Sequence, residues 1–210
     1  MKTLVVAATV QEITAIYDHF GLPHNEFVQT KEFDLLITGV GMTATAYALG
    51  KYLSEDYALV LNLGIAGSFD RSVALGTVLN IISDEFSELG AEDKNIFLTI
   101  DDLGFGKSRY CGNYTTNHPV LQQISTVTGI TVNKVHGNTT SIEEVTKRLE
   151  PFTESMEGAA VFYACEKAGI PALQIRSISN YVEERNRDAW NIGLAIKNLN
   201  QWAIEFLTKA

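Results

Sequence analysis

Short runs of apolar residues recur along this chain, and most of them are continuous rather than alternating with polar positions. A continuous run is typical of a strand that is buried on both faces, because a strand with one solvated face alternates. The predicted strands are Leu4–Ala8, Asp34–Thr38, Ala58–Ile65, Thr77–Ser83, Val132–His136 and Ala172–Ile178. Such strands need helices on both sides of a largely parallel sheet.

Helical spacing fills the segments between these strands. Apolar residues at positions 13, 16, 17 and 20 lie on one face of a helix between Thr9 and Phe20. The further predicted helices are Met42–Leu53, Ser141–Leu149, Glu157–Ala168, which Gly169 ends, and a last one from about Arg187 to Leu207. Phe86 to His118 lacks a clear period and is predicted as a long excursion that carries function or an interface. The pattern favours one α/β domain over residues 1–210.

Charge and composition narrow the function classes. The formal net charge of −9 argues against nucleic acid and anionic membrane as partners, because both prefer a basic surface. No apolar run approaches the ~20 residues of a membrane span, and the apolar start is too short for a signal peptide, so we expect a cytoplasmic protein. Cys111 and Cys165 are far apart and lack metal-ligand spacing, so neither a metal site nor a disulfide is predicted.

Small residues follow two of the predicted strands, at the edge where open α/β sheets bind ligands. Gly39-Val40-Gly41 follows a strand and opens a helix, so its amides could face a ligand, although a plain tight turn is the alternative. The third glycine of a dinucleotide fingerprint is missing. Gly64-Ile65-Ala66-Gly67 would admit a flat ligand, or would simply pack tightly.

Glu12 has two interpretations. Thr9 to Glu12 matches a capping box, with Thr9 as the N-cap and Glu12 as the third helical residue. Alternatively, Glu12 is a carboxylate at the edge of the sheet that activates water as a general base. The two can coexist, but we expect a catalytic carboxylate to point away from the cap.

Polar residues near the last strand also carry alternatives. Glu157 either stabilises a helix N-terminus or accepts two hydrogen bonds from a sugar diol. Arg176 lies within an apolar strand and needs a partner, for which Glu157 is a candidate. Asn180 serves a turn or reads the edge of a base. The segment from Glu183 to Trp190 is a solvated loop or a lid with arginines for an anion and a Trp for stacking.

Taken together, several segments resemble the purine nucleoside phosphorylase and nucleosidase superfamily, in the family's order and over nearly the whole chain. They are Gly39–Gly41, Asn62–Gly67, Ser83–Glu85, Glu154–Ala160 and Arg176–Asn180. The Met-Glu-Gly-Ala-Ala run is the most specific of them. The nucleosidase branch is the most similar, and within it the futalosine hydrolases, on the cues Leu89–Asp93, Leu103–Gly106 and the stretch from Ser179 to Trp190.

The resemblance implies a three-layer α/β/α fold with a central twisted mixed sheet, a homodimer or larger homo-oligomer, and no cofactor or metal. It implies that Glu12 activates the attacking water, that Met156 and Glu157 hold the ribose hydroxyls, and that Trp190 covers the substrate. The further substrate-binding positions are Val40, Ile65, Ala66, Gly67 and Ser179.

Asn180 stands where adenine-specific nucleosidases of this family carry an Asp. An Asp donates to N7 and accepts from the 6-amino group of adenine, whereas a 6-oxopurine presents acceptors at both N7 and O6. An Asn amide can donate to both without a repulsive carboxylate oxygen. Asn180 is therefore predicted to stabilise a leaving hypoxanthine or guanine, which makes Glu12, Glu157 and Asn180 the expected catalytic residues.

The expected reaction is futalosine plus water giving hypoxanthine and dehypoxanthine futalosine, a product used for menaquinone. Phosphorylases of the family hold phosphate with arginines, one of them beside the first strand-end loop, but Ala7 to Glu12 has none. We expect Arg185 or Arg187 to contact the carboxylate on the tail of futalosine. The alternatives are a phosphorylase, a methylthioadenosine/S-adenosylhomocysteine nucleosidase, which Asn180 disfavours, and a nucleoside-binding protein without activity.

Overall fold

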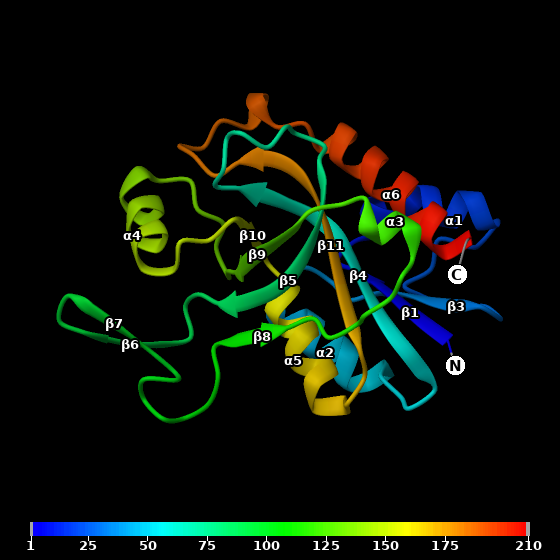
Figure 1. The fold of residues 1–210 in the computed structure, drawn as a ribbon, viewed down its shortest axis with the longest axis horizontal. Coiled ribbons are helices and arrows are strands. Elements are labelled where there is room, and N and C mark those ends of the chain that lie inside the picture. The colour runs from blue at the N-terminus through cyan, green and yellow to red at the C-terminus, as the bar shows by residue number, and fades with distance from the viewer. Residues whose placement is uncertain (1, 209–210) are drawn as a thin grey trace.

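The computed structural model describes residues 2–208, and a mixed sheet runs through its centre (Figure 1). The strands of this sheet are β1 Lys2–Ala7, β2 Phe27–Gln29, β3 Phe33–Ile37, β4 Tyr57–Ser68, β5 Val78–Phe86, β8 Arg109–Cys111, β9 Thr126–Thr131, β10 Thr153–Ser155 and β11 Ala172–Tyr181. Their order is β10-β9-β5-β11-β4-β1-β3-β2, with β8 paired to β5. A separate hairpin, β6 Gly90–Asp93 and β7 Ile96–Thr99, projects from the body.

Helices cover both faces of the sheet. They are α1 Thr14–Phe20, α2 Met42–Tyr52, α3 Pro119–Gln122, α4 Thr139–Leu149, α5 Gly158–Ala168 and α6 Ile192–Thr208, with short 3-10 helices η1 Val10–Ile13 and η2 Arg187–Ala189. Helices α1, α3 and α6 lie on one face, and α2 and α5 on the other. The expected three-layer α/β/α arrangement with a mixed sheet is confirmed.

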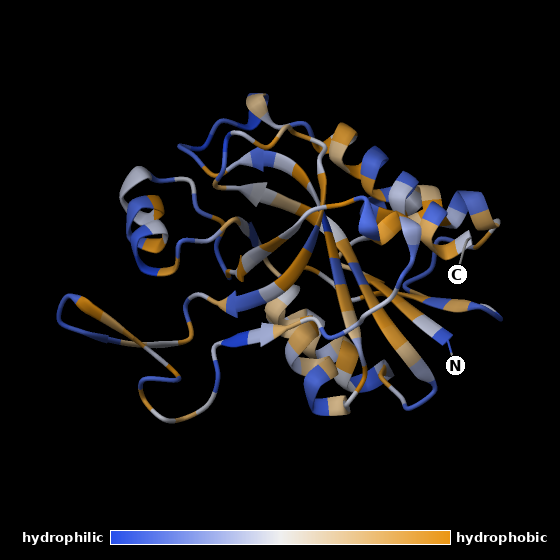
Figure 2. Cartoon of the chain, viewed as in Figure 1, coloured by the Kyte–Doolittle hydropathy of each residue, from blue (hydrophilic) through white to orange (hydrophobic). Residues whose placement is uncertain are grey.

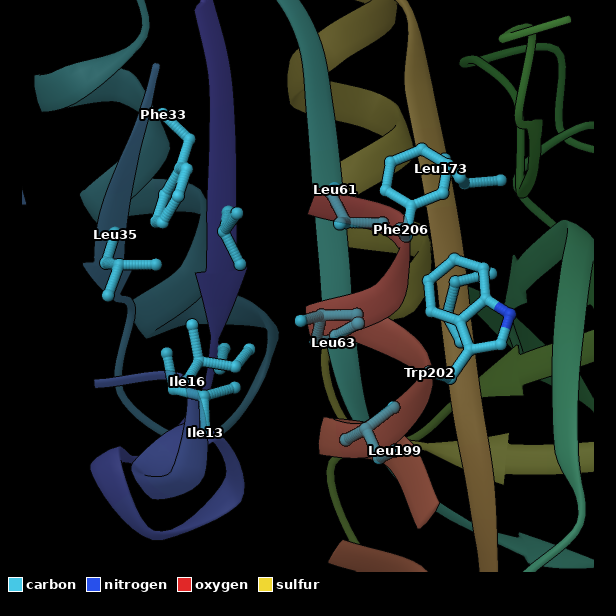
Figure 3. Packing of buried hydrophobic residues seen from close by; sticks show 14 of the residues in the cluster. Ile13, Ile16, Phe33, Leu35, Leu61, Leu63, Leu173, Leu199, Trp202 and Phe206 are labelled. Atoms are coloured by element: carbon cyan, nitrogen blue, oxygen red, sulfur yellow. The ribbon is translucent and has the colours of Figure 1, made fainter. Parts of the chain in front are cut away.

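One core lies under α1 and α6 (Figure 3). Ile13 and Ile16 pack there with Leu61 and Leu63 of β4, all without solvent exposure, and Trp202 joins them from α6. Full burial of each aliphatic side chain contributes about 1.5–3 kcal/mol. In Figure 2 the central strands are mostly apolar and the outer loops mostly polar, which matches burial of the strands on both faces.

The sheet curls at one end. Strand β10 pairs in parallel with β9 and antiparallel with β4, so the strands β4, β11, β5, β9 and β10 close into a ring. In the described residues, Glu154 of β10 and Asn180 of β11 are both register partners of Gly67 on β4. The ring therefore brings the ends of three strands to one place.

One predicted strand is wrong. Val132–His136 forms no strand, because the strand in this region, β9, ends at Thr131. Strand β9 was not predicted because its threonines interrupt the apolar run and Gly129 lies in its middle, and Gly is depleted in strands. Val132 is fully buried and its N–H donates to the Ser155 carbonyl at 2.9 Å, but the chain then leaves the sheet.

The other elements differ mainly at their ends. The last helix begins at Ile192 rather than near Arg187, where η2 forms a separate turn. Gly169 ends α5 in the left-handed conformation, with φ of 69°, as predicted. The excursion from Phe86 to His118 adds β8 to the sheet besides the β6–β7 hairpin. Within residues 2–208, no helix combines the length and the apolar character that crossing a membrane requires.

Candidate active site

A cavity of about 330 Å³ opens where β1, β4 and β11 end and α5 begins. Most of its wall is formed by residues in or directly after β1, β4, β10 and β11, and by residues at the start of α6. The predicted site residues in this wall are Glu12, Val40, Ile65, Ala66, Gly67, Met156, Glu157, Ser179, Asn180 and Trp190. The remaining lining residues are Ala8, Thr9, Gln11, Val135, His136, Glu154, Ser155, Ile192 and Ile196.

Glu12 serves the cap and the cavity at the same time. Its Oε2 accepts from the Thr9 N–H at 3.0 Å and from the Thr9 hydroxyl at 3.1 Å, which completes the capping box. Its Oε1 accepts from the Ile65 N–H at 3.3 Å and faces the end of β4. Glu12 therefore lines the cavity while one of its oxygens stays in the cap, whereas we expected a catalytic carboxylate to point away from the cap.

Burial raises the pKa of Glu12, and the neighbouring Glu157 raises it further, while Arg176 and the Ile65 and Thr9 amides oppose the rise. A carboxyl whose pKa lies above the ordinary glutamate range is a stronger base towards water once it is ionised.

Arg176 lies behind the cavity wall, beside Glu12 and Glu157, with 1% of its surface exposed. Its Nη2 is 3.8 Å from Glu157 Oε2, so the predicted partner is found, although at the long limit of an ion pair. The Nε and Nη2 atoms make no hydrogen bond with any described residue. Two guanidinium nitrogens without a hydrogen bond are costly to bury, and a bound water or ligand hydroxyl would satisfy them.

Glycines make room for this charged group. A Cβ on Gly64 would lie 1.8 Å from Arg176 Nη1, so any other residue there would displace the buried guanidinium group. Gly41, with φ of 92°, directs its N–H at Glu157 Oε1 over 2.9 Å. The turn that contains Val40 therefore orients Glu157, which is the N-cap residue of α5 rather than part of its first turn.

Asn180 lies at the other end of the cavity, beside Gly67. Its Oδ1 accepts from the Ser179 hydroxyl at 2.8 Å, which sets the direction of the amide. Its Nδ2 donates one hydrogen to the Tyr181 carbonyl at 3.1 Å. The second amide hydrogen has no acceptor among the described residues.

Arg185 and Arg187 do not line the cavity. Both guanidinium groups lie over the Trp190 ring, at 5.2 and 5.9 Å from its centre, and both side chains are exposed. Arg185 also donates its N–H to the Gly137 carbonyl at 3.2 Å. The two arginines thus pack against Trp190, which lines the cavity, instead of forming its wall themselves.

Sequence reasoning missed a buried pair in the wall, His136 and Glu154. His136 Nδ1 lies 2.6 Å from Glu154 Oε2, and the His136 N–H donates to Glu154 Oε1 at 2.9 Å. The two residues are 18 positions apart, so no local spacing joins them. The available signal was Glu154 itself, an acidic residue at the start of the quoted segment Glu154–Ala160.

A second buried network supports the N-terminus of α5. Gln174 accepts from Asn62 at 3.0 Å and donates to Asp84 at 2.8 Å. The Thr131 hydroxyl donates to Asp84 at 2.7 Å and accepts from the Ala159 N–H at 2.7 Å. Complete burial raises the pKa of Asp84 to about 6. These bonds connect four strands to the helix that carries Glu157.

Comparison with known proteins defines the class of this fold and site. The Phosphorylase superfamily model matches residues 28–208, so the chain belongs to that superfamily. Within it, the chain is 30% identical to the futalosine hydrolase of Streptomyces coelicolor, over 95% of this chain and 92% of the relative.

Solved structures agree on the fold. A futalosine hydrolase of Helicobacter pylori matches with a TM-score of 0.84 at 17% identity, over 100% of this chain and 98% of the other. A Helicobacter pylori methylthioadenosine nucleosidase variant matches with a TM-score of 0.83, also at 17% identity, over 100% of this chain and 99% of the other. At such identities the likeness shows the fold alone, which both kinds of nucleosidase share.

Proposed function

We propose that this chain is an N-glycosidase that hydrolyses futalosine to hypoxanthine and dehypoxanthine futalosine. The observation that carries the proposal is one cavity with buried carboxylates, Glu12 and Glu157, at one end and the Asn180 amide at the other. The 30% identity to a curated futalosine hydrolase supports the choice of substrate.

Glu12 activates the attacking water in this mechanism. Its Oε1 lies beside Gly64 and the Arg176 guanidinium, whose positive charge stabilises the ionised carboxylate that the reaction needs. The Glu12 carboxylate accepts a proton from the water as the water oxygen attacks the anomeric carbon. The glycosidic electron pair leaves with the base as an anion, which then takes up a proton to give hypoxanthine, while the protonated Glu12 gives one up and returns to a carboxylate.

Glu157 and Asn180 stabilise the charges that develop. The sugar becomes cationic as the bond breaks, and the carboxylates of Glu12 and Glu157 favour that charge, while Glu157 accepts from the ribose hydroxyls beside Met156. The base becomes anionic, and the remaining Asn180 amide hydrogen can donate to N7 or to O6 of a 6-oxopurine, but not to both as the sequence predicted, because the Tyr181 carbonyl accepts the other one.

The cavity wall favours water over phosphate. Among its described residues there is no Lys or Arg, whereas Glu12, Glu154 and Glu157 are all present. Carboxylates around an enclosed site repel a phosphate dianion, because Coulomb repulsion is strong where the dielectric is low. We therefore favour hydrolysis over phosphorolysis.

The tail carboxylate of futalosine would meet the arginines only if the segment around Trp190 rearranges. Arg185 and Arg187 remain our proposed contacts, since they are the cations beside the mouth. Arg185→Ala and Arg187→Ala should each raise KM for futalosine while KM for inosine, which lacks the tail, stays unchanged. Unchanged KM for futalosine in both variants would contradict this assignment.

Three wider properties belong to the same proposal: a homodimer or larger oligomer, a cytoplasmic location and a place in menaquinone formation. Exposed apolar side chains on α2 and α5, among them Tyr47 and Tyr163, support self-association of that face. Sedimentation of the wild type and of Tyr47→Arg tests the assembly, and cell fractionation tests the location.

The deciding experiment scores the base released from futalosine, aminodeoxyfutalosine, inosine and methylthioadenosine, with and without phosphate. We expect hypoxanthine from futalosine at a rate that phosphate does not change. Dependence on phosphate would make the chain a phosphorylase, and release of adenine alone would overturn the role of Asn180.

A further inference from the structure

The cavity has two chemically distinct ends, set by the order of residues along β4. Gly64 lies against Arg176 and Glu12, and Gly67 lies against Asn180 and Glu154. Strands rise about 3.3 Å per residue, so the two ends are roughly 10 Å apart. That span suits a nucleoside whose sugar lies at the Gly64 end and whose base lies at the Gly67 end.

The pair of His136 and Glu154 belongs to the base end. A Cβ on Gly67 would lie 3.1 Å from Asn180 Nδ2 and 3.7 Å from Glu154 Cγ, so Gly67 has Asn180 on one side and Glu154 on the other. Both His136 and Glu154 line the cavity. The mechanism described above uses neither of them.

Glu154 holds one ring nitrogen of His136. The carboxylate has 3% of its surface exposed and accepts from both the backbone N–H and Nδ1 of His136. A carboxylate cannot donate, so the Nδ1 atom carries the proton and Nε2 of a neutral imidazole is an acceptor. Nε2 makes no hydrogen bond with a described protein atom, and the ring has only 10% of its surface exposed.

We propose that His136 is a specificity-determining residue, whose Nε2 accepts a hydrogen bond from the N1–H of a 6-oxopurine, and that Glu154 is the positioning residue that fixes this tautomer. The inference rests on the proposed function and extends it. A 6-oxopurine presents N7, O6 and N1–H in sequence along one edge, so that edge can meet Asn180 and then His136. Adenine has a lone pair at N1, which would face the Nε2 lone pair unfavourably.

Removal of the imidazole tests the contact. His136→Ala should lower kcat/KM for futalosine by about 10-fold or more, while kcat/KM for aminodeoxyfutalosine, which differs only at the 6-position, changes less than about 3-fold. His24→Ala is the matched control, because His24 pairs with Asp18 at 2.8 Å on the surface. Equal losses on both substrates would mean a merely structural histidine and would overturn the proposal.

Reversal of the tautomer is the sharper test. In Glu154→Gln the amide oxygen still accepts from the His136 N–H, so the amide nitrogen faces Nδ1 and the ring proton moves to Nε2. Nε2 then donates a hydrogen bond, which the lone pair at N1 of adenine can accept. The ratio of kcat/KM for the 6-oxo over the 6-amino substrate should fall by about 10-fold or more. An unchanged ratio would overturn the proposal.

Binding of the free bases separates this inference from the proposed function. Calorimetric titration with hypoxanthine and adenine should show wild-type preference for hypoxanthine and loss of that preference in Glu154→Gln. If the wild type cleaves no futalosine but keeps this pattern, the substrate proposal fails and the His136 assignment stands. If futalosine is cleaved and the base preference is the same in both proteins, the His136 assignment fails alone.

Discussion

At the scale of single residues, Glu12 divides two tasks between two oxygens. Oε2 completes the capping box, and Oε1 accepts from the N–H of Ile65, another residue of the cavity wall. Glutamine also completes a capping box. Glu12→Gln should therefore lower kcat by roughly 10²–10⁴-fold, because the general base is lost, while Tm changes little, because the loss of the acceptor for the Ile65 N–H offsets the neutralisation of a desolvated carboxylate. Kinetics and thermal unfolding measure both, and a Tm that falls together with activity would contradict the division.

The raised pKa of Glu12 gives a second prediction at this scale. Water activation needs the ionised carboxylate. Burial and the neighbouring Glu157 raise the pKa of Glu12, so this carboxylate forms only at a higher pH. The kcat/KM for base release should fall on acidification, with its midpoint above the ordinary glutamate value of about 4.3. A pH profile of the wild type measures that midpoint. A midpoint at or below that ordinary value would count against Glu12 as the base.

At the scale of elements, Thr131 connects β9 to the start of α5. Its hydroxyl bridges Asp84 and the Ala159 N–H at 2.7 Å each, without solvent exposure. Thr131→Val removes the partner of the Ala159 N–H and of Asp84 Oδ1, although Gln174 still donates to Asp84 Oδ2, and should lower the free energy of unfolding by about 2–4 kcal/mol. Activity should fall as well, because the same turn carries Glu157.

Thr128 offers the matched control for this element, since it is exposed on the same strand. Thr128→Val should change the free energy of unfolding by no more than about 0.5 kcal/mol. Urea unfolding and kcat of both variants form the test. Equal stability of the two variants would show that the buried network does not hold α5 in place.

The same elements show what sequence alone can predict. Continuous apolar runs predicted β1, β4 and β11, because those strands are buried on both faces. Strand β9 was placed wrongly because its threonines and Gly129 lack that pattern. Strand β10 was missed because it spans only Thr153–Ser155 and depends on partners on both sides.

Site residues, too, were predicted where a local sequence pattern marks them and missed where they depend on tertiary contacts. Residues within quoted segments, such as Glu157 and Asn180, were predicted and do lie in one cavity wall. His136 was missed because its partner, Glu154, reaches it only through the closure of β10 onto β4. Contacts that depend on tertiary strand pairing have no periodic pattern in the sequence, so sequence alone does not predict them.

At the scale of the whole molecule, ring closure buries polar groups that an open sheet would leave in water. Glu12, Asp84, Glu154 and Arg176 all have less than a tenth of their surface exposed. Burial disfavours the charged form of a carboxyl group, so such groups reduce stability where they ionise. The buried carboxyl groups therefore lower the free energy of unfolding by an amount that depends on pH.

Asp84 lets that cost be measured. Its pKa is raised from 3.8 to about 6 by complete burial, so its contribution to stability is fully present below 3.8 and is lost as pH rises through about 6. Asn at this position does not titrate. The difference in unfolding free energy, wild type minus Asp84→Asn, should fall by about 1–2 kcal/mol from about pH 5 to about pH 8.

Asp70→Asn provides the control with the opposite sign. The Ser72 N–H donates to the exposed Asp70 carboxylate at 2.7 Å and lowers its pKa below 3.8. Its contribution is complete above 3.8 and is lost only on acidification, so the corresponding difference should stay flat over the same range. Urea unfolding at matched ionic strength measures both differences. If the Asp84 difference is flat too, Asp84 is ionised throughout that range, and the hydrogen bonds from Thr131 and Gln174 outweigh its desolvation.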